Sequence, residues 1–275
     1  MRGFFMSLTA IEQHGIVLLG CGKMGSAMLA GWLADGLSPS AVWVLDPNPS
    51  DWLQGTGVHI NEGVPDAPAI ALIAVKPQMM GDALPSMAAL GNSNTVFLSV
   101  AAGTPISAFA SALGAQSPII RAMPNTPAAI GRGITAIVGN EIVTPAQMDM
   151  ADALLRAVGQ VVRLEDESQM DAVTAVSGSG PAYVFHLVET LAAAGKAEGL
   201  PADLAMALAK ATVGGAGQLA EDSDENPSQL RVNVTSPNGT TQAALEVLMN
   251  EHDGFPALLK RAVKAAADRS RELAK

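Results

Sequence analysis

The stretch Ile16-Val17-Leu18-Leu19-Gly20-Cys21-Gly22-Lys23-Met24-Gly25 decides the fold class of this chain. Its four apolar residues predict a buried strand, and a helical pattern begins at Met24. Strand, tight glycine turn and helix in this order are the context of a dinucleotide-binding fingerprint. Gly20 would make the turn, Gly22 would let the backbone approach a pyrophosphate, and Gly25 would let the helix pack closely on the strand. An ordinary glycine turn is the weaker alternative, because the motif opens a repeating strand–helix chain.

Apolar strand-like runs alternate with helical segments from Gly15 to about Leu164, which predicts a mostly parallel, doubly wound sheet covered on both faces. The expected strands are Ile16–Leu19, Val42–Leu45, Ile70–Val75, Val96–Val100, Ile119–Met123, Gly133–Val138 and Val161–Leu164. The expected helices of this part are Met24–Ala34, Met79–Ala89, Pro105–Leu113 and Pro145–Val158.

Strand signals vanish after Leu164, and helical spacing of Ala, Leu, Met and Gly continues to Lys275. The expected helices are Ser168–Ala175, Pro181–Gly195, Pro201–Ala220, Thr240–Met249 and Pro256–Leu273. Several are apolar around more than one face, which favours burial against a second chain. The sequence therefore predicts an α/β chain of two domains. Residues 1–165 would form a Rossmann-like dinucleotide-binding domain, and residues 166–275 an all-helical domain for substrate binding and oligomerisation.

Composition limits the possible partners and compartments. Sixteen Lys and Arg against 26 Asp and Glu give a formal net charge of −10, which argues against nucleic acid and anionic membranes. Cys21 is the only cysteine, so an internal disulfide and a cysteine metal site are excluded, and no metal is expected. Cys21 is interpreted as a spacer in the turn, with a reactive thiol of lowered pKa as the alternative. The extension before Gly15 is too poor for a signal peptide and no apolar run reaches membrane-spanning length, so a soluble, cytoplasmic protein is expected.

A second glycine-bearing turn lies near the other end of the chain, in Ser236-Pro237-Asn238-Gly239-Thr240-Thr241. It leads directly into a helix rich in alanine and leucine. Free backbone N–H groups and threonine hydroxyls at a helix start can hold an anion without a basic side chain. The alternative is an ordinary capped helix, because Ser and Thr are favoured at caps in any case.

Small or turn-forming residues follow the predicted strands at the edge where a doubly wound sheet collects ligands. These loops are Lys76-Pro77-Gln78 after Val75, Ala101-Ala102-Gly103-Thr104, and Pro124-Asn125-Thr126-Pro127. They would line a groove for the ribose and nicotinamide of the cofactor. A further glycine-rich turn, Ser177-Gly178-Ser179-Gly180-Pro181-Ala182-Tyr183, is expected to open the long helix of the second half.

These motifs together resemble those of the pyrroline-5-carboxylate reductase family, from Gly15 to about Lys264. The resemblance includes Ala74-Val75-Lys76-Pro77-Gln78 and Arg121-Ala122-Met123-Pro124-Asn125-Thr126-Pro127, in the family's order with the three glycine-bearing segments. It implies NAD(P)H-dependent reduction of the imine of 1-pyrroline-5-carboxylate to L-proline, the last step of proline biosynthesis. It also implies a homodimer through the helical domain, or a larger ring of dimers. One departure is Asn238, where the family usually has glycine; asparagine tolerates positive φ, so the turn should survive.

The resemblance and the residues together assign roles within the site. Thr241 would hydrogen-bond the imine nitrogen as the catalytic residue, and Ser236 would support it. The substrate-binding residues are expected to be Ser236, Asn238, Gly239, Thr240 and Thr241, with backbone N–H groups of the last three holding the carboxylate. The cofactor-binding residues are expected to be Gly20, Cys21, Gly22, Lys23, Met24, Gly25, Asp46, Asn48, Val75, Lys76, Pro77, Ala101, Gly103 and Asn125.

The choice between NADH and NADPH can be argued from the second predicted strand. Asp46 ends that strand, near the spacing at which an acidic group meets the ribose 2′-hydroxyl. No Lys or Arg occurs between Lys23 and Lys76 to receive a 2′-phosphate. The sequence therefore favours NADH, although Asn48 and Ser50 could still bind a phosphate.

Two other functions fit part of the pattern. A related reductase of hydroxy acids would place a proton donor on the second domain's helices, where only Lys196 and Lys210 offer one, outside any motif. A nicotinamide sensor without turnover would not need Gly239, Thr240 and Thr241, which are intact. The histidines suggest no site: His186 is expected to pack between helices, and no motif surrounds His14, His59 or His252.

Overall fold

Contacts within the chain divide the computed structural model, which describes residues 9–273, into two units. The first comprises Met1–Gly178 and Ala267–Lys275, and the second Ser179–Ala266. The division falls later than the predicted boundary after residue 165, because the segment that follows the last strand packs on the sheet: Met170 and Ala175 are fully buried. The functions assigned to the two predicted domains stay predictions. The first eight residues of the extension before Gly15 lie outside the described residues.

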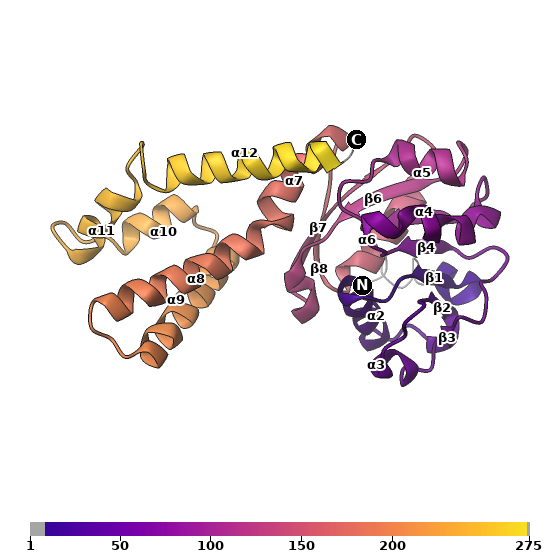
Figure 1. Cartoon of the computed structure of the whole chain (residues 1–275), viewed down its shortest axis with the longest axis horizontal. Coiled ribbons are helices and arrows are strands. Elements are labelled where there is room, and N and C mark those ends of the chain that lie inside the picture. The colour runs from indigo at the N-terminus through magenta and orange to yellow at the C-terminus, as the bar shows by residue number, and fades with distance from the viewer. Residues whose placement is uncertain (1–8, 274–275) are drawn as a thin grey trace. The chain divides into compact units, whose positions relative to one another are not determined.

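The first unit contains a sheet of eight strands among the described residues, in the order β3-β2-β1-β4-β5-β6-β7-β8 (Figure 1). Neighbouring strands are parallel except β6 and β7, which are antiparallel. The predicted mostly parallel, doubly wound sheet is confirmed. The strands are β1 (Ile16–Leu19), β2 (Val42–Leu45), β3 (His59–Ile60), β4 (Ile70–Ile73), β5 (Val96–Ser99), β6 (Ile119–Met123), β7 (Gly133–Gly139) and β8 (Gly159–Arg163).

Alternating side chains of the strands build a core on each face of the sheet, which is why the strands read as continuous apolar runs. Ile16 and Leu18 of β1 pack with α2 (Lys23–Ala34) and α6 (Pro145–Arg156), while Val17 and Leu19 pack with α4 (Met80–Ala83) and α5 (Ile106–Leu113). On the first face, the Trp32 indole N–H donates to the Leu154 carbonyl oxygen at 3.0 Å and ties α2 to α6.

Several predicted boundaries in the first unit are wrong for local reasons. Strand β3 and helix α3 (Asp51–Gln54) were not expected, because each is too short to show a periodic pattern. The single helix predicted over Met79–Ala89 is α4 followed by a 3₁₀ helix, Leu84–Leu90. Pro85 lacks an N–H group and cannot continue an α-helix without losing a hydrogen bond.

The segment Ser177–Tyr183 opens the long helix α8 (Gly180–Ala197) as predicted, but its first residues are π-helical and do not form a glycine turn. Helix α7 (Met170–Val173) continues into a π-helical segment, Thr174–Gly178, and α8 begins two residues later. The hydroxyls of Thr174 and Ser177 donate to carbonyl oxygens four residues earlier, at 2.9 and 3.1 Å. Such bonds compete with the helical ladder, and wide turns of this kind are frequent at functional sites.

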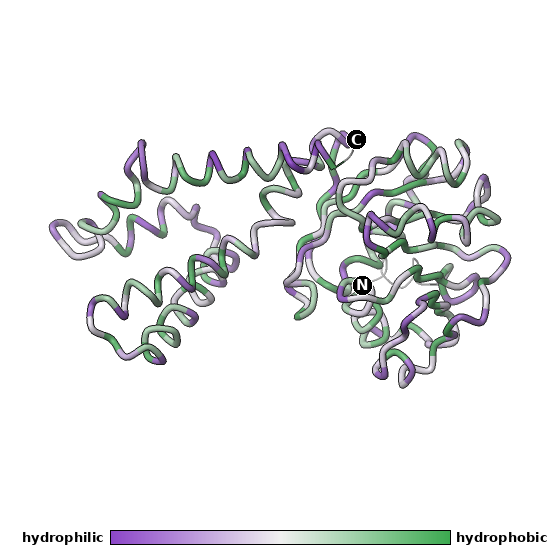
Figure 2. The backbone as a smooth tube through the Cα atoms, viewed as in Figure 1, coloured by the Kyte–Doolittle hydropathy of each residue, from purple (hydrophilic) through white to green (hydrophobic). Residues whose placement is uncertain are grey.

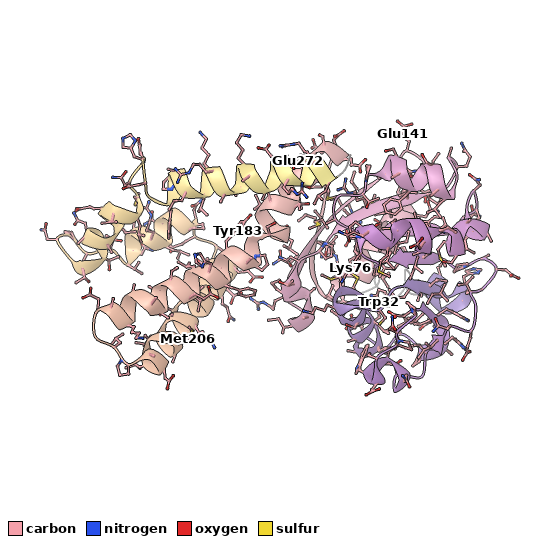
Figure 3. The ribbon with its side chains drawn as sticks, viewed as in Figure 1. Trp32, Lys76, Glu141, Tyr183, Met206 and Glu272 are labelled. Atoms are coloured by element: carbon pink, nitrogen blue, oxygen red, sulfur yellow. The ribbon has the colours of Figure 1, made fainter. Side chains whose placement is uncertain are left out.

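The second unit is helical throughout its described residues. It contains α8, α9 (Ala202–Asp222), α10 (Pro227–Asn233), α11 (Thr240–Leu248) and most of α12 (Phe255–Leu273), which ends in the first unit. Helices α8 and α9 pack side by side as a hairpin, on which Figure 3 marks Tyr183 and Met206. Helix α10 was not expected. Helix α9 extends through Asp222, and the Asn226 side chain caps α10 by accepting the Ser228 N–H at 3.0 Å.

Apolar side chains of the second unit remain largely exposed within one chain. Among the residues described in this unit, the buried apolar side chains are those of Ala192, Ala205 and Ala209 alone. Large side chains such as Phe185, which is 61% exposed, and Leu208 face outward, and apolar residues recur along these helices in Figure 2. Exposed apolar surface of this extent marks an interaction surface. None of the helices within residues 9–273 is long and apolar enough to cross a bilayer.

Candidate cofactor and substrate sites

Backbone geometry requires the glycines of the first turn. Gly20 has a φ of +88°, and a Cβ there would lie 2.8 Å from the Val75 side chain. A Cβ at Gly25 would overlap the Gly20 carbonyl oxygen. These are the turn and the close helix–strand packing that the sequence predicts.

Gly22 differs from the other two glycines, because a Cβ there would meet nothing within 4 Å. Its glycine identity is therefore not explained by the fold, and it fits a site where a ligand approaches the backbone. Gly22 also precedes the first residue of α2, and no side chain among the described residues caps that helix. The first N–H groups of α2, from Lys23 onward, thus remain available for an anion such as a pyrophosphate.

Asp46, at the end of β2, is bonded to the glycine turn. The Cys21 N–H donates to Asp46 Oδ2 at 2.7 Å, and the Asn48 N–H donates to Asp46 Oδ1 at 2.8 Å. An ionised carboxylate has about four acceptor positions, so two remain for a ligand. The structure therefore brings two of the predicted cofactor residues, Cys21 and Asn48, to the carboxylate of a third, Asp46.

The thiol of Cys21 is not activated. Burial and the nearby negative charge of Asp46 raise the pKa of the Cys21 thiol to about 11. A raised pKa keeps the sulfur protonated, and therefore unreactive, at neutral pH. The alternative of a lowered pKa is wrong, and the spacer interpretation remains.

The ends of β1, β2, β4, β5 and β6 meet at one edge of the sheet, where strand order reverses between β1 and β4. Ligands collect at such a switch point. The Ala74 N–H donates to the Leu19 carbonyl oxygen at 2.8 Å, which continues the β1–β4 pairing and brings Val75 beside the glycine turn. Lys76 and Pro77 follow and are exposed; Lys76 is labelled in Figure 3.

The two remaining predicted loops at this edge are fixed by other parts of the first unit. Ala101 and Gly103 are buried, and a Cβ at Gly103 would lie 3.2 Å from the Cβ of Leu273, near the end of α12. The side-chain oxygen of Asn125 accepts the Ile134 N–H at 2.9 Å. That oxygen thus holds the start of β7, and its second lone pair and the carboxamide N–H groups remain for a ligand.

A buried ion pair that the sequence analysis missed supports the loop after β5. Arg121 Nη1 donates to Glu167 Oε1 at 2.8 Å, and the side chains are 6% and 31% exposed. The same oxygen accepts the Ile106 N–H at 2.9 Å, at the start of α5. Glu167 therefore neutralises a buried cation and caps the helix that follows Ala101 and Gly103. An arginine inside the predicted strand β6 was the available signal, but its partner 46 positions away could not be read from spacing.

The second glycine-bearing turn begins α11. Asn238 has a φ of +58°, so asparagine does accept the position at which the family usually has glycine. The Gly239 N–H donates to the Ser236 carbonyl oxygen at 3.1 Å, and the Asn238 N–H donates to the Gln242 side chain at 2.8 Å. The Gly239 N–H therefore closes the turn within the chain, and its predicted role in binding the carboxylate stays a prediction.

Donors nevertheless remain at this helix start. No side chain within residues 9–273 caps α11, which leaves the N–H groups of Thr240 and Thr241 in its first turn for an anion. Thr241 is half-buried, whereas Ser236, Asn238 and Thr240 are exposed within one chain.

The histidines form no site in the described structure. The His186 side chain is 75% exposed, and its Nδ1 lies 3.3 Å from Glu189, so it does not pack between helices of the same chain as predicted. His59 stacks on Trp43 with ring centroids 4.6 Å apart. No cluster of three His, Cys, Asp or Glu side chains among residues 9–273 could hold a metal ion.

Comparison with known proteins matches both parts of the chain. Residues 167–273 match the model for pyrroline-5-carboxylate reductase dimerisation, and residues 15–103 match that for NADP oxidoreductase, coenzyme F420-dependent. The chain is 40% identical over 266 residues to a pyrroline-5-carboxylate reductase of Pseudomonas aeruginosa, covering 94% of this chain and 96% of the relative.

Solved structures agree with these sequence relationships. A pyrroline-5-carboxylate reductase from Coxiella burnetii has a TM-score of 0.87 and 33% identity, covering 95% of this chain and 99% of that one. The pyrroline carboxylate reductase of Plasmodium falciparum with NADP bound has a TM-score of 0.83 and 27% identity, covering 96% and 99%.

The two glycines Gly22 and Gly25 should respond differently to alanine. Gly25→Ala places a methyl group against the Gly20 carbonyl and should destabilise the free protein by about 1–3 kcal/mol. Gly22→Ala meets open space, so the free energy of unfolding should change by less than about 0.5 kcal/mol. Its affinity for reduced nicotinamide dinucleotide should nevertheless fall at least about tenfold, or ~1.4 kcal/mol. Urea unfolding and fluorescence titration measure the two effects; unchanged cofactor affinity in Gly22→Ala would refute its role.

Glu167→Ala leaves the Arg121 cation buried without its partner. Removing one member of a buried pair costs about 3–5 kcal/mol, and the partial exposure of Glu167 should reduce this to about 2–3 kcal/mol. Urea unfolding measures the loss. Glu165→Ala, an exposed carboxylate two positions earlier, is the matched control and should change stability by less than about 0.5 kcal/mol. Equal losses of unfolding free energy in the two variants would contradict the role of Glu167 as the partner of the buried Arg121 cation.

Proposed function

The chain belongs to the pyrroline-5-carboxylate reductase family and is a nicotinamide-dependent reductase of proline biosynthesis; we propose that it prefers NADH and that α11 binds its substrate. The helical unit matches a dimerisation model, and the protein is a homo-oligomer. The exposed apolar surface of α8 and α9 supports a homodimer as the building block, and larger rings of dimers would be assembled from it.

The preference for NADH rests on Asp46. Two backbone N–H groups fix its carboxylate at the end of β2 and leave acceptor positions that suit the adjacent hydroxyls of an unphosphorylated ribose. A 2′-phosphate would bring negative charge beside this carboxylate. Two unit charges about 5 Å apart repel by about 1–3 kcal/mol at effective dielectric constants of ~20–80. No Lys or Arg between Lys23 and Lys76 offsets that repulsion.

The first turn of α11 supports the recognition of the substrate carboxylate. The N–H groups of Thr240 and Thr241 belong to an uncapped helix start, where the helix dipole favours negative charge. Recognition by backbone groups agrees with the acidic composition of the chain, because no basic side chain is required. Asn238 and Gly239 shape the turn and Ser236 supports it; in this proposal these three residues position the donors.

Reduction of the imine requires no strongly acidic or basic side chain. The bound cofactor supplies a hydride to the imine carbon. An imine that is already protonated accepts the hydride without a strong general acid, as its C=N π electrons move to nitrogen and give the secondary amine. Thr241 Oγ1 would accept a hydrogen bond from the imine N–H and hold that nitrogen in place. Orientation of this kind can contribute several kcal/mol to rate acceleration.

The competing functions lack a comparable site. A hydroxy-acid reductase needs a placed proton donor, but Lys196 and Lys210 are both exposed on α8 and α9 of the chain. A sensor without turnover would not need the intact turn before α11. Family membership also favours imine reduction over both alternatives.

The cofactor preference can be measured from initial rates with saturating pyrroline-5-carboxylate. The wild-type protein should show a kcat/KM for NADH at least about tenfold above that for NADPH, equivalent to ~1.4 kcal/mol. Asp46→Asn keeps the shape of the side chain and removes its charge, so the ratio should fall toward one. A wild-type protein that favours NADPH would overturn the proposed preference.

Thr241 can be tested with three substitutions that separate the hydroxyl from the shape. Thr241→Val and Thr241→Ala should lower kcat/KM for the imine about 100-fold, since they remove the group that holds its nitrogen. Thr241→Ser retains the hydroxyl and should recover most of the rate. Fluorescence titration should show unchanged cofactor affinity in all three. A fully active Thr241→Val protein would remove the hydroxyl from the mechanism.

A further inference from the structure

We propose that Asn61 is a specificity-determining positioning residue, which holds Asp46 in the orientation that distinguishes NADH from NADPH. This inference rests on the NADH preference proposed above. It concerns a residue that lies after β3, outside the glycine turn and outside the strand that carries Asp46.

The Asn61 side chain makes hydrogen bonds to both the N–H and the carbonyl group of Asp46. Its side-chain oxygen accepts the Asp46 N–H at 3.0 Å, and its side-chain nitrogen donates to the Asp46 carbonyl oxygen at 2.8 Å. Only one orientation of the carboxamide makes both bonds. Strand β3 has two residues, paired with Trp43 and Val44 of β2. The Asn61 side chain therefore continues the β2–β3 ladder by one residue after the strand itself has ended.

The backbone of Asn61 is suited to this task. Its φ is +55°, in the left-handed region that asparagine tolerates better than most residues. This conformation ends β3 and turns the side chain back along β2. The Asn61 N–H also donates to the Val44 carbonyl oxygen at 2.9 Å, so the backbone of Asn61 is anchored independently of its side chain.

These two hydrogen bonds restrain the backbone of a residue whose carboxylate is already held by hydrogen bonds. The Cys21 and Asn48 N–H groups hold its two oxygens, and Asn61 holds the main chain from which the carboxylate projects. Four hydrogen bonds thus fix Asp46 before a ligand arrives. A fixed carboxylate presents its remaining acceptor positions to a ribose diol and cannot turn away from a 2′-phosphate. Without the Asn61 side chain, Asp46 could move. This movement would weaken its hydrogen bonds to the ribose hydroxyls of NADH and reduce its repulsion of the 2′-phosphate of NADPH.

Loss of the Asn61 side chain should leave the surrounding structure intact. The Trp43–His59 stack and the Asn61–Val44 backbone bond still join β3 to β2. Glycine accepts the positive φ at no steric cost, so Asn61→Gly removes the two side-chain bonds without introducing backbone strain. Asn61 is therefore a suitable position for a test by substitution.

The matched control is Asn92, another left-handed asparagine, with a φ of +52°. Its side-chain oxygen accepts the Gln116 N–H at 3.0 Å, so it also bonds to backbone. It precedes β5 and therefore lies near the amino ends of the parallel strands, at the edge opposite the cofactor loops. Asn92→Gly reproduces the chemical change of Asn61→Gly away from Asp46.

The experiment measures equilibrium dissociation constants of NADH and NADPH by fluorescence titration of the full-length wild-type, Asn61→Gly and Asn92→Gly proteins. Asn61→Gly should bind NADH about tenfold more weakly, while its affinity for NADPH is unchanged or higher. The preference should therefore shift toward NADPH by about tenfold. Asn92→Gly should retain both wild-type constants.

Each outcome separates the two proposals. A wild-type protein that binds NADPH more tightly overturns the NADH preference itself. A wild-type protein that prefers NADH, with the same ratio in Asn61→Gly, overturns the role of Asn61 alone. Equal weakening of both cofactors would show a general structural role and would also overturn it. If Asn61→Gly fails to fold, Asn61→Asp removes the donor to the Asp46 carbonyl. The negative charge added by this substitution disfavours NADPH. A shift of the affinity ratio toward NADPH in this variant would therefore come from the lost hydrogen bond to the Asp46 carbonyl.

Discussion

The hydrogen bond from the Cys21 N–H to the Asp46 carboxylate is the interaction on which the organisation of the cofactor site depends. It joins the turn after β1 to the end of β2, and so fixes the start of α2 relative to Asp46, the residue proposed to bind the ribose. The bond is possible because Gly20 adopts a positive φ and Gly25 lets α2 approach the turn. Burial, together with the nearby charge of Asp46, raises the pKa of the Cys21 thiol and keeps it protonated. One geometric constraint thus serves the fold and both parts of the proposed cofactor site, the pyrophosphate-binding turn and the ribose-binding carboxylate.

Sequence reasoning recovered the features that depend on periodicity. The continuous apolar runs predict the long strands because parallel sheets are buried on both faces. The glycine spacing predicts the turn after β1 because backbone approach allows no other residue at Gly20 and Gly25. Short elements were not predicted: β3 has two residues and shows no period, yet Asn61, which bonds to Asp46, follows it directly. The ion pair between Arg121 and Glu167 was not predicted for another reason: contacts between residues distant in sequence leave no local pattern.

The segment before α8 shows where a correct motif leads to an incorrect structure. Glycine, serine and proline at 177–181 predict a turn on propensity alone. Serine and threonine hydroxyls can instead bond back into the preceding helical turn, and a π-helical segment then absorbs the mismatch. The turn before α11 was anticipated more closely, including the left-handed Asn238. The bond from the Gly239 N–H to the Ser236 carbonyl was not anticipated, because it is visible only in three dimensions.

The central claim is that a fixed carboxylate at the end of β2 recognises an unphosphorylated ribose. A crystal structure of the protein with NADH bound tests it most directly. The account predicts that Asp46 keeps its bonds to the Cys21 and Asn48 N–H groups and accepts a hydrogen bond from the ribose 2′-hydroxyl, at about 2.7 Å. A ribose whose 2′-hydroxyl faces solvent, with Asp46 turned away from it, would contradict the account.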